Sequence, residues 1–167
     1  MTISHTAHLP APPEHVFGYL YSVDWFAQWY PGLKESFLVG GDGLGRVHTA
    51  RGTSGAIEML VDFRIVAFAP PHGLAWSMEN ARHGKKGKGK HTPSGTADMA
   101  LIAQLLPEGG GTSATMAVTE PGAVPDLRTG EPLKDLLGGA VSQWVTGRTM
   151  QKAVTGSLEN LARIVGG

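Results

Sequence analysis

The stretch PLKDLLGGAVSQWVTGRTMQKAVTGSLENLARIV, from Pro132 to Val165, decides the fold of this chain. Its apolar residues recur at intervals of three and four, the pattern of a helix with one buried face. Pro132 suits the first helical turn, where its missing N–H costs nothing, and Gly166 suits the C-terminal stop. A helix this long is expected to lie across most of a domain of 167 residues. The apolar positions are Leu133, Leu136, Leu137, Ala140, Val141, Trp144, Val145, Val154, Leu158, Leu161, Ala162 and Val165.

The middle of this helix interrupts its apolar face. At about 100° per residue, Arg148, Gln151 and Thr155 project close to the direction of Trp144, on the side expected to be buried. An unpaired charge in a packed core is very costly. This part of the helix therefore either faces a cavity or lets the Arg148 guanidinium reach solvent beyond its own methylenes.

Upstream of this helix the hydrophobic pattern predicts one strand, two short helices and then a sheet. Residues 2–9 form the first strand, and Pro12 and Pro13 open a helix. Asp24 caps a second short helix that carries Trp25, Phe26 and Trp29 and that Pro31 and Gly32 end. From Leu33 onward, apolar and polar residues alternate in segments separated by glycine- and proline-rich turns, as in antiparallel strands. The predicted strands cover residues 35–39, 46–51, 57–65, 74–78, 97–105 and 112–120.

About seven antiparallel strands in a meander, with one apolar face, must be covered by another layer. Only the C-terminal helix is long enough to cover them. The predicted architecture is therefore α+β: a curved antiparallel sheet wrapped around the long C-terminal helix, with two short helices after the first strand. A single helix against a curved sheet leaves space at the open end, so a pocket is expected there. Residues 1–167 are interpreted as one domain.

Four short motifs resemble the START-like (SRPBCC) superfamily, which includes polyketide cyclases, the birch-pollen allergen group and lipid-transfer domains. They are APPEHVF at 11–17, VD at 23–24, WYPG at 29–32 and the glycine-rich VGGDGLG at 39–45. The first three are similar to the opening of bacterial cyclase/dehydrase-like members, and the resemblance covers essentially the whole chain. It implies a helix-grip fold with an apolar ligand cavity. It does not determine the activity, because members include catalysts, carriers, sensors and chaperone cofactors.

Composition excludes several classes of site and partner. The formal net charge is zero and cysteine is absent, so no broad basic surface for nucleic acid, no disulfide and no thiolate metal site is expected. The N-terminus does not resemble a secretory signal, and no apolar run approaches the length that spans a bilayer. The expectation is a cytoplasmic protein, monomer or homodimer, that does not insert stably into membranes and holds no cofactor.

The candidate ligand-binding residues are inward-facing positions of the strands, together with two tryptophans of the helices. Methionine fills irregular space and adapts to different ligands, so four methionines on facing strands favour an adaptable lining. Ordinary core packing is the alternative for each of them. Trp25, Trp29 and Tyr30 could form the pocket mouth, or could hold the short helices on the sheet. The predicted lining residues are Trp29, Met59, Phe63, Trp76, Met78, Met99, Met116 and Trp144.

Arg148 and Gln151 are the polar ligand-binding candidates and weak catalytic candidates. A guanidinium aimed into an apolar cavity would orient a carboxylate, enolate or phenolate. The alternative is a structural pair of Arg148 with a carboxylate of the sheet, such as Asp62 or Asp98. His48 is the one histidine considered as an acid or base, although a surface imidazole is the more ordinary interpretation. Histidine spacing predicts no metal site.

The run GKKGKGK at 84–90 is the main concentration of like charge. Glycine alternating with lysine buries little surface, so the run is interpreted as a solvated hairpin loop. It lacks the spacing of a phosphate-binding loop. Contact with nucleic acid or anionic lipid is the less favoured alternative.

Three functions follow as hypotheses. The first is binding of an apolar or aromatic small molecule, lipid- or polyketide-like, between the sheet and the C-terminal helix. The second is an aromatase/cyclase-type enzyme in which Arg148 and Gln151 polarise a substrate carbonyl. The third is a protein-interaction module of the chaperone-cofactor kind, which should expose a large apolar patch. No obvious acid–base pair supports the enzyme, so binding is favoured.

Overall fold

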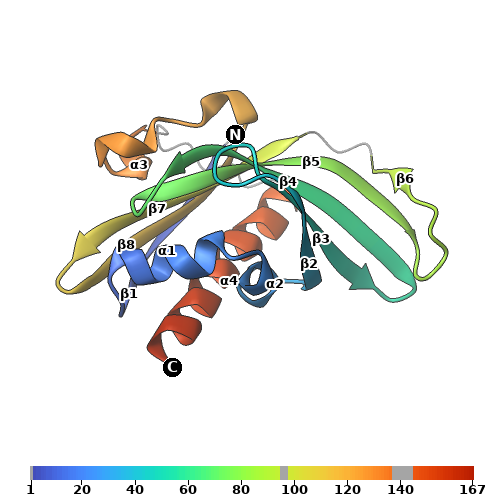
Figure 1. The fold of residues 1–167 in the computed structure, drawn as a ribbon, viewed down its shortest axis with the longest axis horizontal. Helices are drawn as coiled ribbons and strands as arrows, with labels where there is room; N and C mark the ends of the chain where they lie inside the picture. The colour runs from blue at the N-terminus through green and yellow to red at the C-terminus, as the bar shows by residue number, and fades with distance from the viewer. Residues whose placement is uncertain (1, 95–97, 137–144) are drawn as a thin grey trace.

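The computed structural model describes residues 2–94, 98–136 and 145–167, and it confirms the predicted helix-grip architecture (Figure 1). One antiparallel sheet follows the order β1-β8-β7-β5-β4-β3-β2, and the short β6 pairs with β5. The strands are β1 (Ile3–Leu9), β2 (Leu33–Gly40), β3 (Val47–Ser54), β4 (Ile57–Ala69), β5 (Gly73–Lys85), β6 (Thr92–Pro93), β7 (Met99–Glu108) and β8 (Gly111–Thr119). The helices are α1 (Pro13–Tyr21), α2 (Val23–Trp29), α3 (Leu133–Leu136) and α4 (Val145–Gly166), with 3-10 turns at Pro121–Ala123 and Leu127–Thr129.

Glycines make the tight connection between β2 and β3, as the sequence predicted. Gly41 and Gly43 have φ values of 88° and 60°, a conformation that side chains with a Cβ adopt reluctantly. A Cβ on Gly41 would also lie 3.0 Å from the Cα of Arg46. The turn therefore brings the start of β3 against the end of β2.

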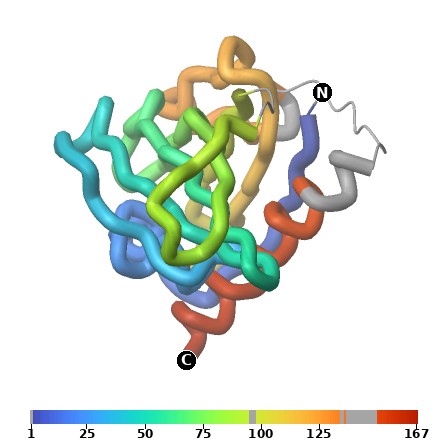
Figure 2. The backbone as a smooth tube through the Cα atoms, turned by 90° about the vertical axis from the view of Figure 1, so that its right-hand side faces the viewer, coloured from blue at the N-terminus to red at the C-terminus, as the bar shows by residue number. Residues whose placement is uncertain are grey.

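The concave face of the sheet is covered from its two edges by different helices. At one edge α4 lies against β1 and β8, which Figure 2 shows as the red helix beside the blue first strand. At the other edge α2 lies against β2. The two helices meet where the Asn160 side chain of α4 donates a hydrogen bond to the Trp29 carbonyl, 3.0 Å away. The predicted burial on α4 is confirmed for Val154, Leu158 and Leu161.

The prediction that Leu133 and Leu161 lie on one helical stripe is wrong. Leu133 packs on the outer, convex face of the sheet with Ile102 and Ala117, whereas Leu161 packs on the concave face. Figure 1 shows α3 and α4 on opposite sides of the sheet. Periodicity cannot reveal this, because both faces of β7 and β8 are apolar and either can bury a leucine.

The predicted cap of α2 is also corrected. The Ser22 hydroxyl, and not the Asp24 carboxylate, accepts the hydrogen bond from the Trp25 backbone N–H. Ser22 ends α1 as well, so one residue stops the first helix and starts the second. The Ser36 hydroxyl of β2 donates to the Val23 carbonyl and fixes α2 on the sheet.

Gln104 attaches the segment before α4 to the convex face. Its side chain, 1% exposed, donates to the Glu131 carbonyl at 2.5 Å and accepts from the Leu133 backbone N–H at 2.7 Å. Both backbone groups would otherwise lack partners beside the sheet. The amide is suited to this position because it is donor and acceptor at once.

We predict that Gln104→Ala lowers the free energy of unfolding by about 2–4 kcal/mol, because it leaves buried backbone groups unpaired. Urea unfolding measures the loss. Gln28→Ala on the exposed face of α2 is the matched control and should change stability by less than about 0.5 kcal/mol. Equal stability of the two variants would contradict the role given to Gln104.

Candidate functional site

A cross-strand row of inward-facing residues forms the centre of the concave face. His48 lies opposite Phe63, Phe63 opposite Met78, and Met78 opposite Met99 across β3, β4, β5 and β7. Phe63 is 2% exposed, whereas Met78 and Met99 keep part of their surface accessible. The structure thus brings three of the predicted lining residues together and adds His48 to them.

The other predicted strand residues divide into two groups. Trp76 and Met116 are fully buried and belong to the packed core. Met59 points to the same side of β4 as Phe63 but lies near the start of the strand, where it is 42% exposed. The methionines therefore occupy three different environments, and only Met78 and Met99 combine a central position with accessible surface.

Phe26 of α2 covers this row and is completely buried. Its ring centroid lies 4.3 Å from that of His48, 4.7 Å from that of Phe63 and 5.6 Å from that of Trp76. Edge-to-face and tilted contacts of this kind stabilise aromatic pairs beyond the area that they bury. Phe26 was predicted to belong to the second helix, and its place at the centre of the aromatic cluster comes from the tertiary fold.

His48 is the polar residue of this cluster, and it is buried, which corrects the expectation of a surface imidazole. Neither ring nitrogen has a hydrogen-bond partner among the described residues. Burial, together with the nearby positive charge of Arg46, lowers the pKa of His48 to about 4, against a smaller opposing effect of Asp62. His48 is therefore neutral at pH 7, with one donor and one acceptor nitrogen.

Two further buried residues carry N–H groups without partners in the described part of the chain. They are the indole Nε1 of Trp76 and the Nε and Nη2 of Arg46. Both groups only donate hydrogen bonds. Buried polar groups are rarely left unpaired, so such a concentration of donors requires an explanation.

Arg46, which the sequence analysis missed, lies at the end of the row nearest α1. Its guanidinium carbon is 3.9 Å from the centre of the Tyr21 ring, a cation–π contact. The Tyr21 hydroxyl donates to the Asp42 carboxylate at 2.5 Å. Burial lowers the pKa of Arg46, and Tyr21 and Asp42 oppose this effect. The predicted strand 46–51 began at Arg46, but nothing in the strand pattern distinguished its side chain as part of a site.

Tyr30, predicted at the pocket mouth, lies beside the row and is half-buried. Its ring centroid is 5.6 Å from that of Phe26 and 5.9 Å from that of Phe63. Burial raises the pKa of the phenol to about 12, so the hydroxyl stays protonated and can donate. Trp29 is fully buried, and its indole N–H donates to the Tyr19 carbonyl, which supports the interpretation that it holds the short helices together.

Trp25 faces away from the row, into a shallow groove between α1 and α2. The groove has a volume of about 430 Å³ and also contacts Glu14, His15 and Tyr19. Trp25 is 42% exposed and its ring packs edge-on against that of Tyr19. The prediction that Trp25 and Tyr30 share one pocket mouth is therefore not supported by their positions.

Of the two polar candidates on the C-terminal helix, Gln151 has a described side chain. Gln151 is exposed on α4, which corrects its expected burial. The side chain of Arg148 and the whole of Trp144 lie outside the described residues. Asp62, a suggested partner of Arg148, instead accepts hydrogen bonds from Thr49, Asn80 and Arg82 at 2.8–3.2 Å. These bonds outweigh desolvation and lower the pKa of Asp62.

The described residues form neither a metal-binding cluster nor a membrane-spanning helix. Within residues 2–94, 98–136 and 145–167, no three acidic or histidine side chains lie close enough together to hold a metal ion. Across the same residues, no helix has both the length and the apolar character required to span a bilayer.

Comparison with known proteins agrees with this architecture. Residues 1–166 match the family model described as polyketide cyclase / dehydrase and lipid transport. The crystal structure of Ara h 8.0201 is similar at a TM-score of 0.66 and 15% identity, over 99% of this chain and 97% of that one. A sequence search among curated proteins found no match.

Two bacterial structures are similar at the level of the fold. The Mll3558 protein from Rhizobium loti has a TM-score of 0.65 and 16% identity, over 98% of this chain and 95% of that one. The Aha1 dimer from Colwellia psychrerythraea has a TM-score of 0.60 and 14% identity, over 99% and 97%. At these identities the likeness concerns the fold alone.

We predict that His48 makes the stability of the protein pH-dependent. The pKa of the imidazole rises from about 4 in the folded chain to about 6.5 in the unfolded chain, so the unfolded state binds the extra proton first. Stability is complete above pH 6.5 and falls as the pH drops from 6.5 towards 4. Between pH 7 and pH 4.5 the loss due to this group is about 2.5 kcal/mol.

Urea unfolding at both pH values, compared with His48→Leu, isolates this contribution from those of the carboxylates. The variant should lose about 2.5 kcal/mol less than the wild type over the same range. Imidazole titration by NMR provides the direct check. A His48 resonance that titrates near pH 6.5 in the folded protein would refute the assignment.

Proposed function

Because the chain belongs to the polyketide cyclase / dehydrase and lipid transport family, we propose that it binds an apolar or aromatic small molecule that carries a hydrogen-bond acceptor. The ligand would lie on the concave face, against Met78 and Met99 and beneath α2. The observation that carries this proposal is the set of unpaired donors in an otherwise aromatic interior. A purely apolar ligand would leave them unpaired.

The lining residues match both the apolar body of this ligand and its hydrogen-bond acceptor. Met78 and Met99 offer accessible apolar surface that adapts to different shapes. Trp76 Nε1 and the donor nitrogen of His48 come from neighbouring parts of the same face, and both can bind a carbonyl, carboxylate or sulfonate oxygen. Buried donors without partners favour such a ligand strongly, because the free-energy cost of removing them from water is not offset by any hydrogen bond within the described part of the protein.

A ligand can reach these donors only if α2 moves, because the Phe26 side chain of this helix lies over them. The side chain fills the space between His48, Phe63 and Trp76, and the donor nitrogens have almost no accessible surface. α2 is a helix of seven residues, held to the sheet by the Ser36 hydroxyl and to α4 by Asn160. Displacement of this helix would expose the donors without disturbing the sheet.

The two alternative functions stay predictions. Cyclisation chemistry depended on Arg148 and Gln151, and Gln151 is exposed on α4. The interaction module depended on an exposed apolar patch, and Phe37, Leu38 and Val39 on the edge strand β2 are exposed without a feature that identifies a partner. Ligand binding is the function with support from several groups of the concave face.

A matched pair of probes tests the proposal: 1-anilinonaphthalene-8-sulfonate and N-phenyl-1-naphthylamine, which lacks the sulfonate. Both should bind, and the sulfonate should bind more tightly because its oxygens pair with the free donors. Met78→Trp should weaken both by about tenfold or more by filling the site. Leu44→Trp, at an exposed position of the β2–β3 loop, is the control and should leave both affinities unchanged.

The indole N–H resonance of Trp76, assigned with Trp76→Phe, reports on the donor directly. It should shift when the sulfonate probe binds and much less with the neutral probe. Thermal unfolding verifies that each variant is folded. Probe binding that is unaffected by Met78→Trp, with an unchanged Trp76 resonance, would refute this site.

A further inference from the structure

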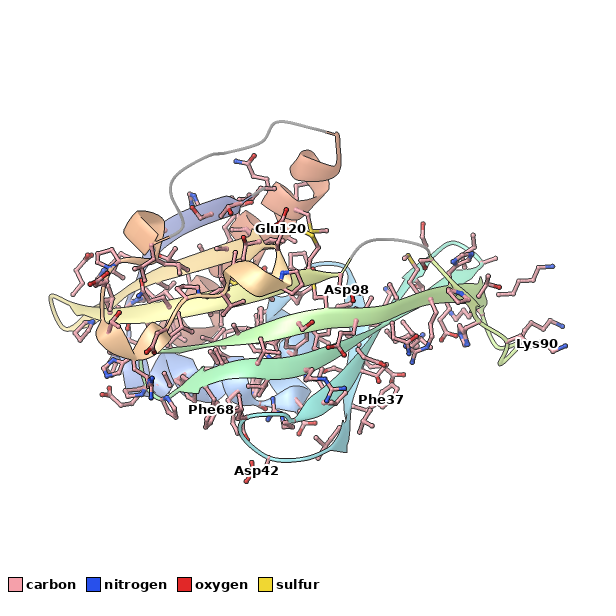
Figure 3. The ribbon with its side chains drawn as sticks, turned by 90° about the horizontal axis from the view of Figure 1, so that it is seen from above. Phe37, Asp42, Phe68, Lys90, Asp98 and Glu120 are labelled. Atoms are coloured by element: carbon pink, nitrogen blue, oxygen red, sulfur yellow. The ribbon has the colours of Figure 1, made fainter. Side chains whose placement is uncertain are left out.

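One end of the sheet, formed by the β3–β4 turn and the β5–β6 loop, combines basic and apolar side chains that the ligand site does not use. We call the exposed side chains of Ile57, Met59 and the lysines at 85, 86, 88 and 90 the basic tip. Ile57 pairs with Lys85 across the two strands, so the apolar and basic groups are neighbours. Figure 3 shows Lys90 in the loop between β5 and β6, at one end of the sheet.

The charge of the basic tip is not neutralised by the chain. All four lysines are exposed, and the salt bridges found among the described residues include none of them. The sequence from 80 to 97 contains no aspartate or glutamate. Four of the seven lysines of a chain with zero formal net charge are therefore concentrated at one end.

The carboxylate of Glu58, which lies between Ile57 and Met59 in the chain, is paired with other side chains. Glu58 accepts from the His91 ring nitrogen at 2.9 Å and lies 3.6 Å from an Arg51 nitrogen. The base of the lysine loop is close-packed, since a Cβ on Gly84 would lie 2.1 Å from the Lys90 carbonyl oxygen. The β5–β6 loop is thus tightly packed at its base, while its lysine side chains are exposed.

The apolar part of the tip continues into the concave face. Ile57, Met59 and Phe63 point to the same side of β4, and their exposure falls from 48% to 42% to 2% along the strand. Exposed isoleucine and methionine beside free lysines match the surface of an anionic bilayer, where lysines bind the headgroups and apolar side chains enter the acyl boundary.

We propose that the basic tip docks this protein on an anionic lipid surface. Single-stranded nucleic acid, the other polyanion, is usually held by aromatic stacking and arginine. Neither the 54–59 turn nor the 83–92 loop contains phenylalanine, tyrosine, tryptophan or arginine. Docking does not depend on the proposed ligand site, so the two proposals can fail separately.

Vesicle co-sedimentation tests the docking, with phosphatidylcholine vesicles and with mixtures of phosphatidylcholine and phosphatidylserine. The protein should bind only the mixed vesicles, and rising salt should release it. The double variant Lys86→Gln/Lys88→Gln should bind about 30-fold more weakly, at about tenfold per 1.4 kcal/mol and about 1 kcal/mol per lysine. The matched control, Lys34→Gln/Lys152→Gln, removes two other exposed lysines and should bind like the wild type.

A second variant separates insertion from charge. Ile57→Ser/Met59→Ser should weaken vesicle binding on the order of tenfold without changing its salt dependence. The proposal is overturned if both lysine pairs have the same effect, which would indicate a general charge effect. It is also overturned if neutral vesicles bind equally, or if single-stranded DNA binds through the same lysines while mixed vesicles do not.

Discussion

A sheet of seven ordered strands is roughly 30 Å wide, whereas a helix with its side chains is about 10 Å across. One helix cannot cover the concave face of such a sheet, even when the sheet curves around it. In this protein α4 covers the edge formed by β1 and β8, and α2 covers the edge formed by β2. Between them, α1 lies against β7, and the remaining space over the central strands is filled by individual side chains. The row from His48 to Met99 lies there, and the rest of the structure depends on how that space is filled.

Aromatic side chains fill this space, and their buried polar atoms lack hydrogen-bond partners. Phe26 packs against His48, Phe63 and Trp76, so the imidazole and the indole are removed from water without receiving partners. The same burial keeps His48 neutral. A core selected for stability alone would place aliphatic residues at these positions, because an unpaired buried donor costs free energy. The donors are explained when the closed arrangement is one of two states and a ligand supplies the acceptor in the other.

Charged side chains are balanced on the convex face of the sheet but not at the basic tip. On the convex face, the carboxylates of Asp62, Glu58 and Glu79 are paired with neighbouring arginines, hydroxyls or histidine, so that face is polar but locally balanced. The basic tip carries lysines without such partners among the described residues. A net charge of zero therefore describes the whole chain and conceals a local field at one end. The apolar side of β4 connects that end with the concave face.

Sequence pattern alone was enough for the order of the strands, for the antiparallel sheet with its apolar face, and for the side of the sheet to which Phe63, Met78 and Met99 point. Alternation and turn residues are local signals, and they survive folding because a strand has only two faces. Tertiary contacts alone bury His48, place Arg46 on the Tyr21 ring and hold Leu133 on the convex face. Those outcomes depend on which distant element covers a position, and residues such as Phe26 that do the covering are far away in the chain. The environment of a side chain is set by its partners across the fold, whereas its direction from the backbone is set by its own strand.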